Sequence, residues 1–340
     1  MTQPRFYIGL DVHKDSTTYV VREQRGSVVV EGECATQYKD LKSVLGPYLI
    51  SAKVALEAST SYYKLYSGFK GEGVDIAVAN TLQLRQLVAK SDPLDARRLS
   101  DMLRLGTMPE SFIPGEDIQR LRSIVHIRQG LVEEKVRWKN RIQALLDMEG
   151  ISLSCWGGAF TQKWIAAFEQ YLASPTANEM VRHAHTQYRG VETHEGEVSE
   201  LMIAATRERW AEEHTLLQSI PGIGPKLACV CIAEIWPISR FASEKKLRRY
   251  AGVVPVVKQS GEHVGKSKLP KKSRRRLLCL ALVQAANAAG RTRTNLGNYY
   301  RRKKKQKKIA GKAKMAVAST ISDIVYKVLT TRSPYVPKAN

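Results

Sequence analysis

The sequence has no uninterrupted apolar run that approaches the roughly 18 residues a membrane-spanning helix needs. It begins with MTQPRFYIGL, which lacks the basic region and apolar run of a secretory signal. We therefore expect a cytoplasmic protein with no membrane partner.

Cysteine is scarce and irregularly spaced. The five cysteines are odd in number and scattered, as expected of reduced thiols in a cytosol. Neither a Cys-x-x-Cys nor a His-x-x-x-His spacing occurs anywhere in the chain. These absences argue against a disulfide framework and against a zinc site.

Acidic residues are scarce in the last hundred positions. Residues 241–340 contain 26 lysines and arginines but only three acids, which is a net charge of +23. Since the whole chain carries +22, the first 240 residues together carry −1. This asymmetry indicates a region dedicated to a polyanion.

Two basic runs, KSKLPKKSRRR and RRKKKQKK, alternate with apolar helical segments such as LLCLALVQAANAA. The alternation indicates a folded basic domain; a solvated basic tail without a specific partner is the alternative. Neither run lies on a helix with an aromatic apolar face, so nucleic acid is favoured over an anionic membrane surface. The predicted nucleic-acid contacts are Gly222, Gly224, Lys226, Lys258, Lys266, Lys268, Lys271, Lys272, Arg274, Arg275, Arg301 and Arg302.

The length of 340 residues exceeds a single core of about 250–300 residues, so we expect two or three domains. In the first, RFYIGLDV, STTYVVRE, GSVVVEGE, AKVALEA and VDIAVAN are predicted strands, with helices at 38–50 and 60–71. Three antiparallel strands followed by alternating helices and strands indicate a mixed α/β sheet covered by helices. A Pro-Gly break near residue 114 ends this domain, which we place at 1–115.

A long helical region follows. Residues 116–149 lack proline and keep a periodic pattern for more than about 25 residues, which indicates a coiled coil or another long helix. The pattern resumes at 195–215, which would suit an antiparallel second arm. We expect a coiled-coil oligomerisation region at 116–214 and a basic, mostly α-helical domain at 215–340.

The stretch SIPGIGPKLA predicts a turn at 221–224 between two helices, the second of which starts at Pro225. Glycines there would let backbone N–H groups approach a phosphate, and the helix N-terminus adds partial positive charge. The motif resembles a helix-hairpin-helix, which binds the DNA backbone without reading its sequence. A glycine-rich connection without a ligand is the alternative.

Four acids of the first domain are candidate metal ligands. Asp11 and Glu57 each end an apolar strand, where an unpaired carboxylate is costly, and adjacent strands would bring both to one edge of the sheet. In KSDPLDARRL, one possibility is that Asp92 caps a helix that opens there and that Asp95 falls in its first turn. The other is that these two carboxylates, three residues apart on one helix face, converge on a divalent cation. Four convergent carboxylates suit two Mg²⁺ ions that grip a phosphodiester.

An apolar first strand that ends in Gly-x-Asp also occurs in sugar kinases and actin-like ATPases. Those proteins need a glycine-rich phosphate turn directly after the strand, whereas here Val12-His13-Lys14 follows. No second glycine-rich phosphate loop appears later, so the pattern argues against an ATPase.

Taken together, YIGLDVHK, ALEASTSYY and KSDPLDARRL, followed by SIPGIGPKLA and YAGVVPVVKQSG, resemble the DEDD transposases of bacterial insertion sequences. That family includes the pilin-gene inverting recombinase and the bridge-RNA-guided recombinases. The resemblance implies a RuvC-like, RNase-H-type N-terminal domain, a coiled coil and a C-terminal transposase domain. In one departure, Ser59-Thr60 follow Glu57-Ala58 where the family commonly has Thr-Gly, so the loop after Glu57 can differ in shape.

The resemblance also implies roles for residues. Asp11, Glu57, Asp92 and Asp95 would bind Mg²⁺, and Ser260 of QSG would attack a DNA phosphodiester to give a phosphoserine and a free 3′ hydroxyl. The surrounding lysines could stabilise a pentavalent phosphate, and Ser267 and Ser273 are local competitors.

The resemblance extends to partners. It implies double-stranded DNA, a four-way junction, a noncoding bridge RNA that chooses the sites, and a homo-oligomer, either a dimer or a tetramer. The location would be the bacterial cytoplasm, at the nucleoid. Two other functions stay open: a RuvC-like junction nuclease that uses water, and a DNA-binding protein with a decayed site.

Overall fold

The computed structural model describes residues 4–58, 62–81, 83–84, 95–151, 161–254, 259–260, 263–264, 275–307 and 310–337. The chain divides into two compact units, Met1–Ile113 and Pro114–Asn340. The further division at residue 214 stays a prediction. No helix in the described ranges is both long and apolar enough to cross a membrane.

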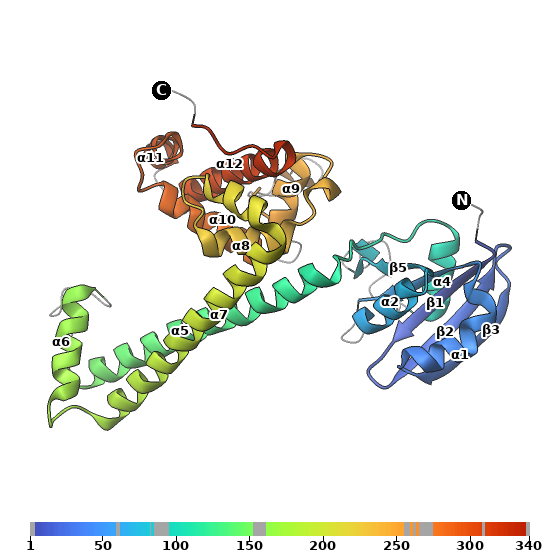
Figure 1. Ribbon diagram of the computed structural model, residues 1–340, viewed down its shortest axis with the longest axis horizontal. Coiled ribbons are helices and arrows are strands. Elements are labelled where there is room, and N and C mark those ends of the chain that lie inside the picture. The colour runs from blue at the N-terminus through green and yellow to red at the C-terminus, as the bar shows by residue number, and fades with distance from the viewer. Residues whose placement is uncertain are drawn as a thin grey trace. The chain divides into compact units, whose positions relative to one another are not determined.

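The first unit contains a five-stranded mixed sheet with the order β3-β2-β1-β4-β5 (Figure 1). Strands β1, β2 and β3 are antiparallel, whereas β4 and β5 continue from β1 in parallel. The mixed sheet predicted from the sequence is thereby confirmed. Its strands are β1 Phe6–Val12, β2 Ser16–Glu23, β3 Val28–Ala35, β4 Ala52–Glu57 and β5 Asp75–Ala79.

Helices cover both faces of this sheet. Because side chains alternate along a strand, Ile8 and Leu10 of β1 pack on one face with α1 (Tyr38–Leu49) and α2 (Tyr62–Gly71). Tyr7 points to the other face, where it packs with Leu99 of α4 (Ala96–Arg104). Two separate apolar cores therefore lie on either side of β1.

The start of α4 differs from the prediction. Asp95 has extended backbone angles (φ −96°, ψ 168°) and caps the helix, since its side chain accepts a hydrogen bond from Arg98 N. The predicted placement of Asp95 inside the first turn of a helix that opens at Asp92 is therefore wrong. Asp92 itself lies outside the described residues.

The second unit begins with two long helices joined through a shorter one. They are α5 (Glu116–Met148), α6 (Gln162–Ala173) and α7 (Glu179–Gln218). The single helix predicted for 116–149 is confirmed, whereas α7 begins 16 residues before the predicted 195. Ion pairs join Asp117 to Arg209 and Arg128 to Glu195, so α5 and α7 run antiparallel (Figure 1). Coiled-coil packing stays a prediction.

The rest of this unit is a helical bundle around one apolar core, to which the last turns of α7 contribute Trp210 and Leu217. The mostly helical character predicted for this region is confirmed. Its elements are α8 Pro225–Ile235, the 3₁₀ helix η2 Ile238–Arg240, α9 Glu244–Ala251, β6 Gln259–Ser260, β7 His263–Val264, α10 Arg276–Ala289, α11 Asn295–Lys307 and α12 Ala310–Thr331.

Candidate functional site

Asp11 and Glu57 lie next to each other at the ends of two parallel strands. Leu10 of β1 pairs with Leu56 of β4, and the two acids are the next residues of their strands. Both carboxylates therefore stand at the carboxyl edge of the sheet, in matching register. The Asp11 side chain is 26% exposed and Glu57 is half-buried, so neither residue is sealed in the core of the described part of this unit.

The two acids also share a face of the sheet. Asp11 comes two residues after Gly9, and Glu57 comes two residues after Ala55. Gly9 contacts the backbone of α4, and Ala55 belongs to the apolar core beneath α4. Because strand side chains alternate, both carboxylates project on the face that α4 covers.

Gly9 determines how closely α4 approaches. A Cβ atom at this position would overlap the carbonyl oxygen of Ala96 and come within 2.6 Å of Ser100 N. The first turn of α4 therefore rests directly on the second half of β1. A glycine within the apolar strand YIGLDV was the available sequence signal for such a close approach.

Asp95 is thereby brought to the same end of β1 as Asp11, because it immediately precedes Ala96. Its Oδ1 atom accepts a hydrogen bond from Arg98 N at 2.7 Å. Asp11 and Glu57 thus share one face and one edge of the sheet, and Asp95 stands at the N-cap of the helix that covers that face. The fourth, Asp92, falls outside the described residues.

His13 adds a basic group to this edge. Its Nε2 atom lies 3.3 Å from Asp11 Oδ2, and its side chain is 65% exposed. The pair keeps one carboxylate oxygen of Asp11 in a polar contact at the rim of the site. Sequence reasoning noted His13 only as a departure from an ATPase pattern.

The described acids supply only some of the oxygen ligands that a divalent cation such as Mg²⁺ needs. Carboxylate oxygens are the ligands that Mg²⁺ prefers, and Asp11 and Glu57 offer them from adjacent positions. Among the described residues, no group of three or more acids, histidines or cysteines lies close enough to hold a metal ion. The described part of the chain therefore supplies a pair of candidate ligands with Asp95 nearby, and not a complete metal site.

Ser260 ends a short strand in the second unit. Strands β6 and β7 pair antiparallel, with Ser260 opposite His263. The Ser260 side chain and six of the predicted nucleic-acid contacts fall outside the described residues. These six are Lys258, Lys266, Lys268, Lys271, Lys272 and Arg274.

The turn predicted at 221–224 is present, but its first glycine has a packing role. Gly222 has a φ of +96°, and a Cβ atom there would overlap the carbonyl oxygen of Ala285 in α10. Gly224 is the N-cap of α8, and nothing lies within 4 Å of the place where a Cβ atom would be. Close approach to a phosphate therefore remains available to Gly224, whereas Gly222 is packed against α10.

Lys226, on α8, belongs to an ionic cluster with residues of the long helices α5 and α7. Its Nζ lies 3.4 Å from Glu195 Oε1, and Glu195 also pairs with Arg128 at 2.9 Å and Lys135 at 3.0 Å. Burial raises the pKa of Glu195, but hydrogen bonds from Lys135 and Ser199 and the charge of Arg128 outweigh it and lower the pKa to about 2. The cluster links α5, α7 and α8, and no spacing rule in the sequence indicated it.

Arg275 also has an internal partner. Its Nε donates to Glu234 Oε2 at 2.8 Å, and Glu234 has only 3% of its side chain exposed. Burial raises the pKa of Glu234, yet the His126 hydrogen bond and the charges of Arg275 and Arg122 lower it overall. The Arg275 side chain is 41% exposed, but its guanidinium is engaged by a buried carboxylate of its own unit.

Arg301 and Arg302, by contrast, are exposed on α11. Arg301 donates to Thr292 O at 3.1 Å and to Asn298 Oδ1 at 2.6 Å. The guanidinium of Arg302 lies 5.4 Å from the ring centroid of Tyr299. Both cations face solvent and can meet an anionic ligand.

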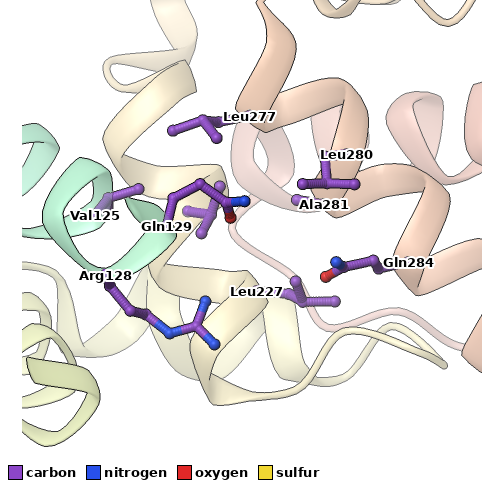
Figure 2. Close-up of a pocket in the computed structure, with 9 residues that line it drawn as sticks. Val125, Arg128, Gln129, Leu227, Leu277, Leu280, Ala281 and Gln284 are labelled. Atoms are coloured by element: carbon purple, nitrogen blue, oxygen red, sulfur yellow. The ribbon is translucent and has the colours of Figure 1, made fainter. Parts of the chain in front are cut away.

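A small cavity where α5, α8 and α10 meet is too small to be the site. Figure 2 shows Arg128 and Gln129 on one side of it and Leu280 and Gln284 on the other. Its volume is about 10 Å³, which is room for about one water molecule. It is a packing gap between helices.

Comparison with known proteins gives two family matches. A family model for DEDD transposases of the IS110 type, described as "Transposase", matches residues 8–149, a range that includes all four predicted acids. A second, described as "Transposase IS116/IS110/IS902 family", matches residues 214–301, which include Ser260.

Individual relatives are similar over most of their length. The transposase for insertion sequence element IS1111A of Coxiella burnetii is 22% identical, over 83% of this chain and 79% of the relative. The transposase for IS1328 of Yersinia enterocolitica is 23% identical, over 80% and 81%. The putative transposase y4qE of Sinorhizobium fredii is 24% identical, over 82% and 70%.

Proposed function

Because this chain belongs to the IS110 family of insertion-sequence transposases, we propose that it cuts and rejoins DNA through the acids of its first unit and Ser260 of its second. The observation that carries the proposal is the matched register of Asp11 and Glu57 on the face covered by α4. Two adjacent carboxylates at an open strand edge suit the binding of a phosphodiester through divalent cations.

The acids have distinct positions in this proposal. Asp11 and Glu57 would hold Mg²⁺ from the sheet, and Asp95 would reach it from the N-cap of α4, together with Asp92. The bound ions would neutralise charge on the phosphate during transfer. His13 would keep one oxygen of Asp11 oriented at the rim.

Ser260 is the proposed nucleophile. Its Oγ would attack phosphorus and lose its proton, while the bond from phosphorus to the 3′ oxygen breaks and that oxygen gains a proton. One product is a DNA strand whose 5′ phosphate is esterified to Ser260, and the other is a strand with a free 3′ hydroxyl. The phosphoserine ester replaces the broken phosphodiester, so rejoining needs no outside source of energy.

We further propose the partners of this reaction. Double-stranded DNA and a four-way junction would be the substrates, and a noncoding bridge RNA would choose the sites. The +23 charge of residues 241–340 supports binding of either nucleic acid. Acids and serine on different units would allow an active site shared between protomers of a dimer or tetramer.

The test is a covalent-capture assay. The protein is incubated with Mg²⁺ and labelled four-way junction DNA made from its element's ends, denatured, and run on a gel that separates protein-bound from free DNA. The wild type should give a covalent adduct. Asp11→Asn, Glu57→Gln and Ser260→Ala should each abolish it, while Ser267→Ala and Ser273→Ala retain it.

The same assay separates the alternatives. If the DNA is cleaved without a covalent protein–DNA adduct, and Ser260→Ala cleaves as well as the wild type, the protein is a junction nuclease that uses water. A wild type that binds the junction but neither cuts it nor depends on Mg²⁺ would identify a decayed site. Either result would overturn the recombinase proposal.

A further inference from the structure

A groove lies between α11, α12 and the C-terminal segment 333–336. It has a volume of about 880 Å³, within the range of small-ligand sites. Tyr299 lines it from α11, Ile324 and Lys327 from α12, and Tyr335 from the C-terminal segment. The three elements lie together at the C-terminal end of the chain (Figure 1).

The C-terminal wall of the groove is held in place by contacts outside it. Tyr335 N donates to Ser219 Oγ at 2.8 Å, at the end of α7. Arg332, just before this segment, pairs with Glu212 and Glu213 of α7. Tyr335 is therefore positioned before any ligand arrives, which lowers the entropic cost of binding.

Among the described residues that line the groove, the charged side chain is that of Lys327. Residues 291–332 contain 13 lysines and arginines and a single acid, Asp323. That acid pairs with Arg248 of α9 at 2.9 Å, so its charge is already matched. Arg302 and Lys303 lie 5.4 and 5.6 Å from the centroid of the Tyr299 ring, which lines the groove. Such a rim favours an anionic ligand and disfavours a basic peptide.

An apolar, aromatic floor with a cationic rim matches the two parts of an unpaired nucleotide. Bases stack on aromatic side chains, and the phosphates that join them attract lysine and arginine. A base within a duplex is stacked between its neighbours and presents no free face to such a floor. We propose that this groove binds an unpaired nucleotide of a single-stranded segment, with its base on Tyr299 and Tyr335 and its phosphates at Arg302, Lys303 and Lys327.

This inference rests on the proposed nucleic-acid function and adds a site to it. In this proposal, α11, α12 and the C-terminal segment distinguish unpaired from paired strands. The candidate acids and Ser260 take no part in that distinction. A single-stranded RNA loop and a displaced DNA strand present the same chemistry, so the test compares the two.

The test measures binding of fluorescent oligouridylate and oligothymidylate of about 12 nucleotides, and of a blunt DNA duplex, to the full chain. Tyr335→Ala should weaken binding of the single strands about five- to a hundredfold, which is the effect of losing one stacked base. Binding of the duplex should stay unchanged. Tyr335→Phe, which keeps the ring, should bind like the wild type.

A second variant tests the rim without touching the floor. Lys327 is exposed, so Lys327→Glu should fold normally, as checked by thermal unfolding, and should weaken binding of both single strands. Tighter binding of oligouridylate than of oligothymidylate would identify RNA as the occupant, and the reverse would identify DNA.

Three outcomes are decisive against parts of this account. Unchanged single-strand binding in both Tyr335→Ala and Lys327→Glu would overturn the groove proposal, and so would an equal loss for duplex and single strands in Tyr335→Ala. A wild type that binds none of the three probes would instead refute the proposed nucleic-acid function itself.

Discussion

Gly9 of β1 and Ala96 of α4 are in backbone contact, so close that any side chain at Gly9 would overlap the carbonyl oxygen of Ala96. This contact brings the N-cap of α4, and with it Asp95, to the end of the strand that carries Asp11. The geometry of the acidic edge therefore depends on the absence of one Cβ atom.

Gly9→Ala should destabilise the first unit by about 1–3 kcal/mol, since a strand and a helix must move apart. All five tryptophans lie within residues 114–340, so their fluorescence reports only on the second unit. Most helical residues belong to the second unit, so we expect the first unit to unfold at lower urea as a minor early phase in far-UV circular dichroism, while the tryptophan transition stays in place. Gly46→Ala is the matched control, because nothing lies within 4 Å of a Cβ there. An unchanged dichroism transition for Gly9→Ala would contradict the close contact.

Gly222→Ala and Gly224→Ala should have different effects, because Gly222 packs against α10 whereas Gly224 is free to approach a phosphate. Gly222 combines a φ of +96° with a contact to Ala285 O, so alanine there should lower the thermal midpoint of the second unit. Gly224 has open space, so alanine there should leave the midpoint nearly unchanged and weaken only nucleic-acid binding. Equal midpoints for the two variants would show that Gly222 does not pack as described.

Glu195→Ala should be among the most destabilising charge removals in the second unit. It would leave Arg128 and Lys135, whose side chains are 17% and 21% exposed, without their shared partner. Loss of one member of a buried ionic group costs about 3–5 kcal/mol. Glu197→Ala removes an exposed acid two residues away and should cost less than about 0.5 kcal/mol. Urea unfolding followed by tryptophan fluorescence measures both.

The contribution of Glu195 should depend on pH in a defined window. Its pKa is lowered from an ordinary 4.5 to about 2, so the unfolded chain takes up the proton first as pH falls. The stabilisation is therefore complete above about pH 4.5 and is lost as the pH falls towards 2. The difference in unfolding free energy between wild type and Glu195→Gln should shrink across that window. A difference that stays constant from pH 6 down to about pH 3 would argue against the lowered pKa.

Arg275 and Arg301 should respond differently to alanine substitution, although the sequence suggested one role for both. Arg275→Ala would leave Glu234 buried with one fewer cation and should lower stability by about 3 kcal/mol. Arg301→Ala should leave the thermal midpoint in place and reduce the salt dependence of nucleic-acid binding by about one unit of slope. Titrations at several salt concentrations, with thermal unfolding alongside, distinguish the two. Equal loss of stability in both variants would contradict the internal role of Arg275.

Much of the architecture was predictable because local patterns encode it. Strand alternation and apolar runs identified the five strands and their mixed order, and the proline-free stretch after residue 115 identified α5. The start of α4 was not predictable in the same way. The pattern Asp92-Pro93 predicted a helix that opens at Asp92, whereas Asp95 caps α4 and the next residue, Ala96, lies against Gly9 of a distant strand.

In the candidate site, too, some features could be predicted from the sequence and others could not. That Asp11 and Glu57 would share an edge followed from their positions at the ends of two apolar strands, and the matched register confirms it. Which arginine pairs with a buried acid did not follow, because Arg275 and Arg301 both belong to runs of basic residues.

The sequence by itself determined the order of elements and the basic C-terminal region, because these are encoded in local composition and spacing. Its resemblance to DEDD transposases indicated the family and the candidate acids. Only the tertiary structure decided which charges are internal, which glycines are in contact and where a groove opens. Those features depend on residues far apart in the chain, such as Glu195 with Arg128 or Tyr335 with Ser219, which come together only when the helices pack.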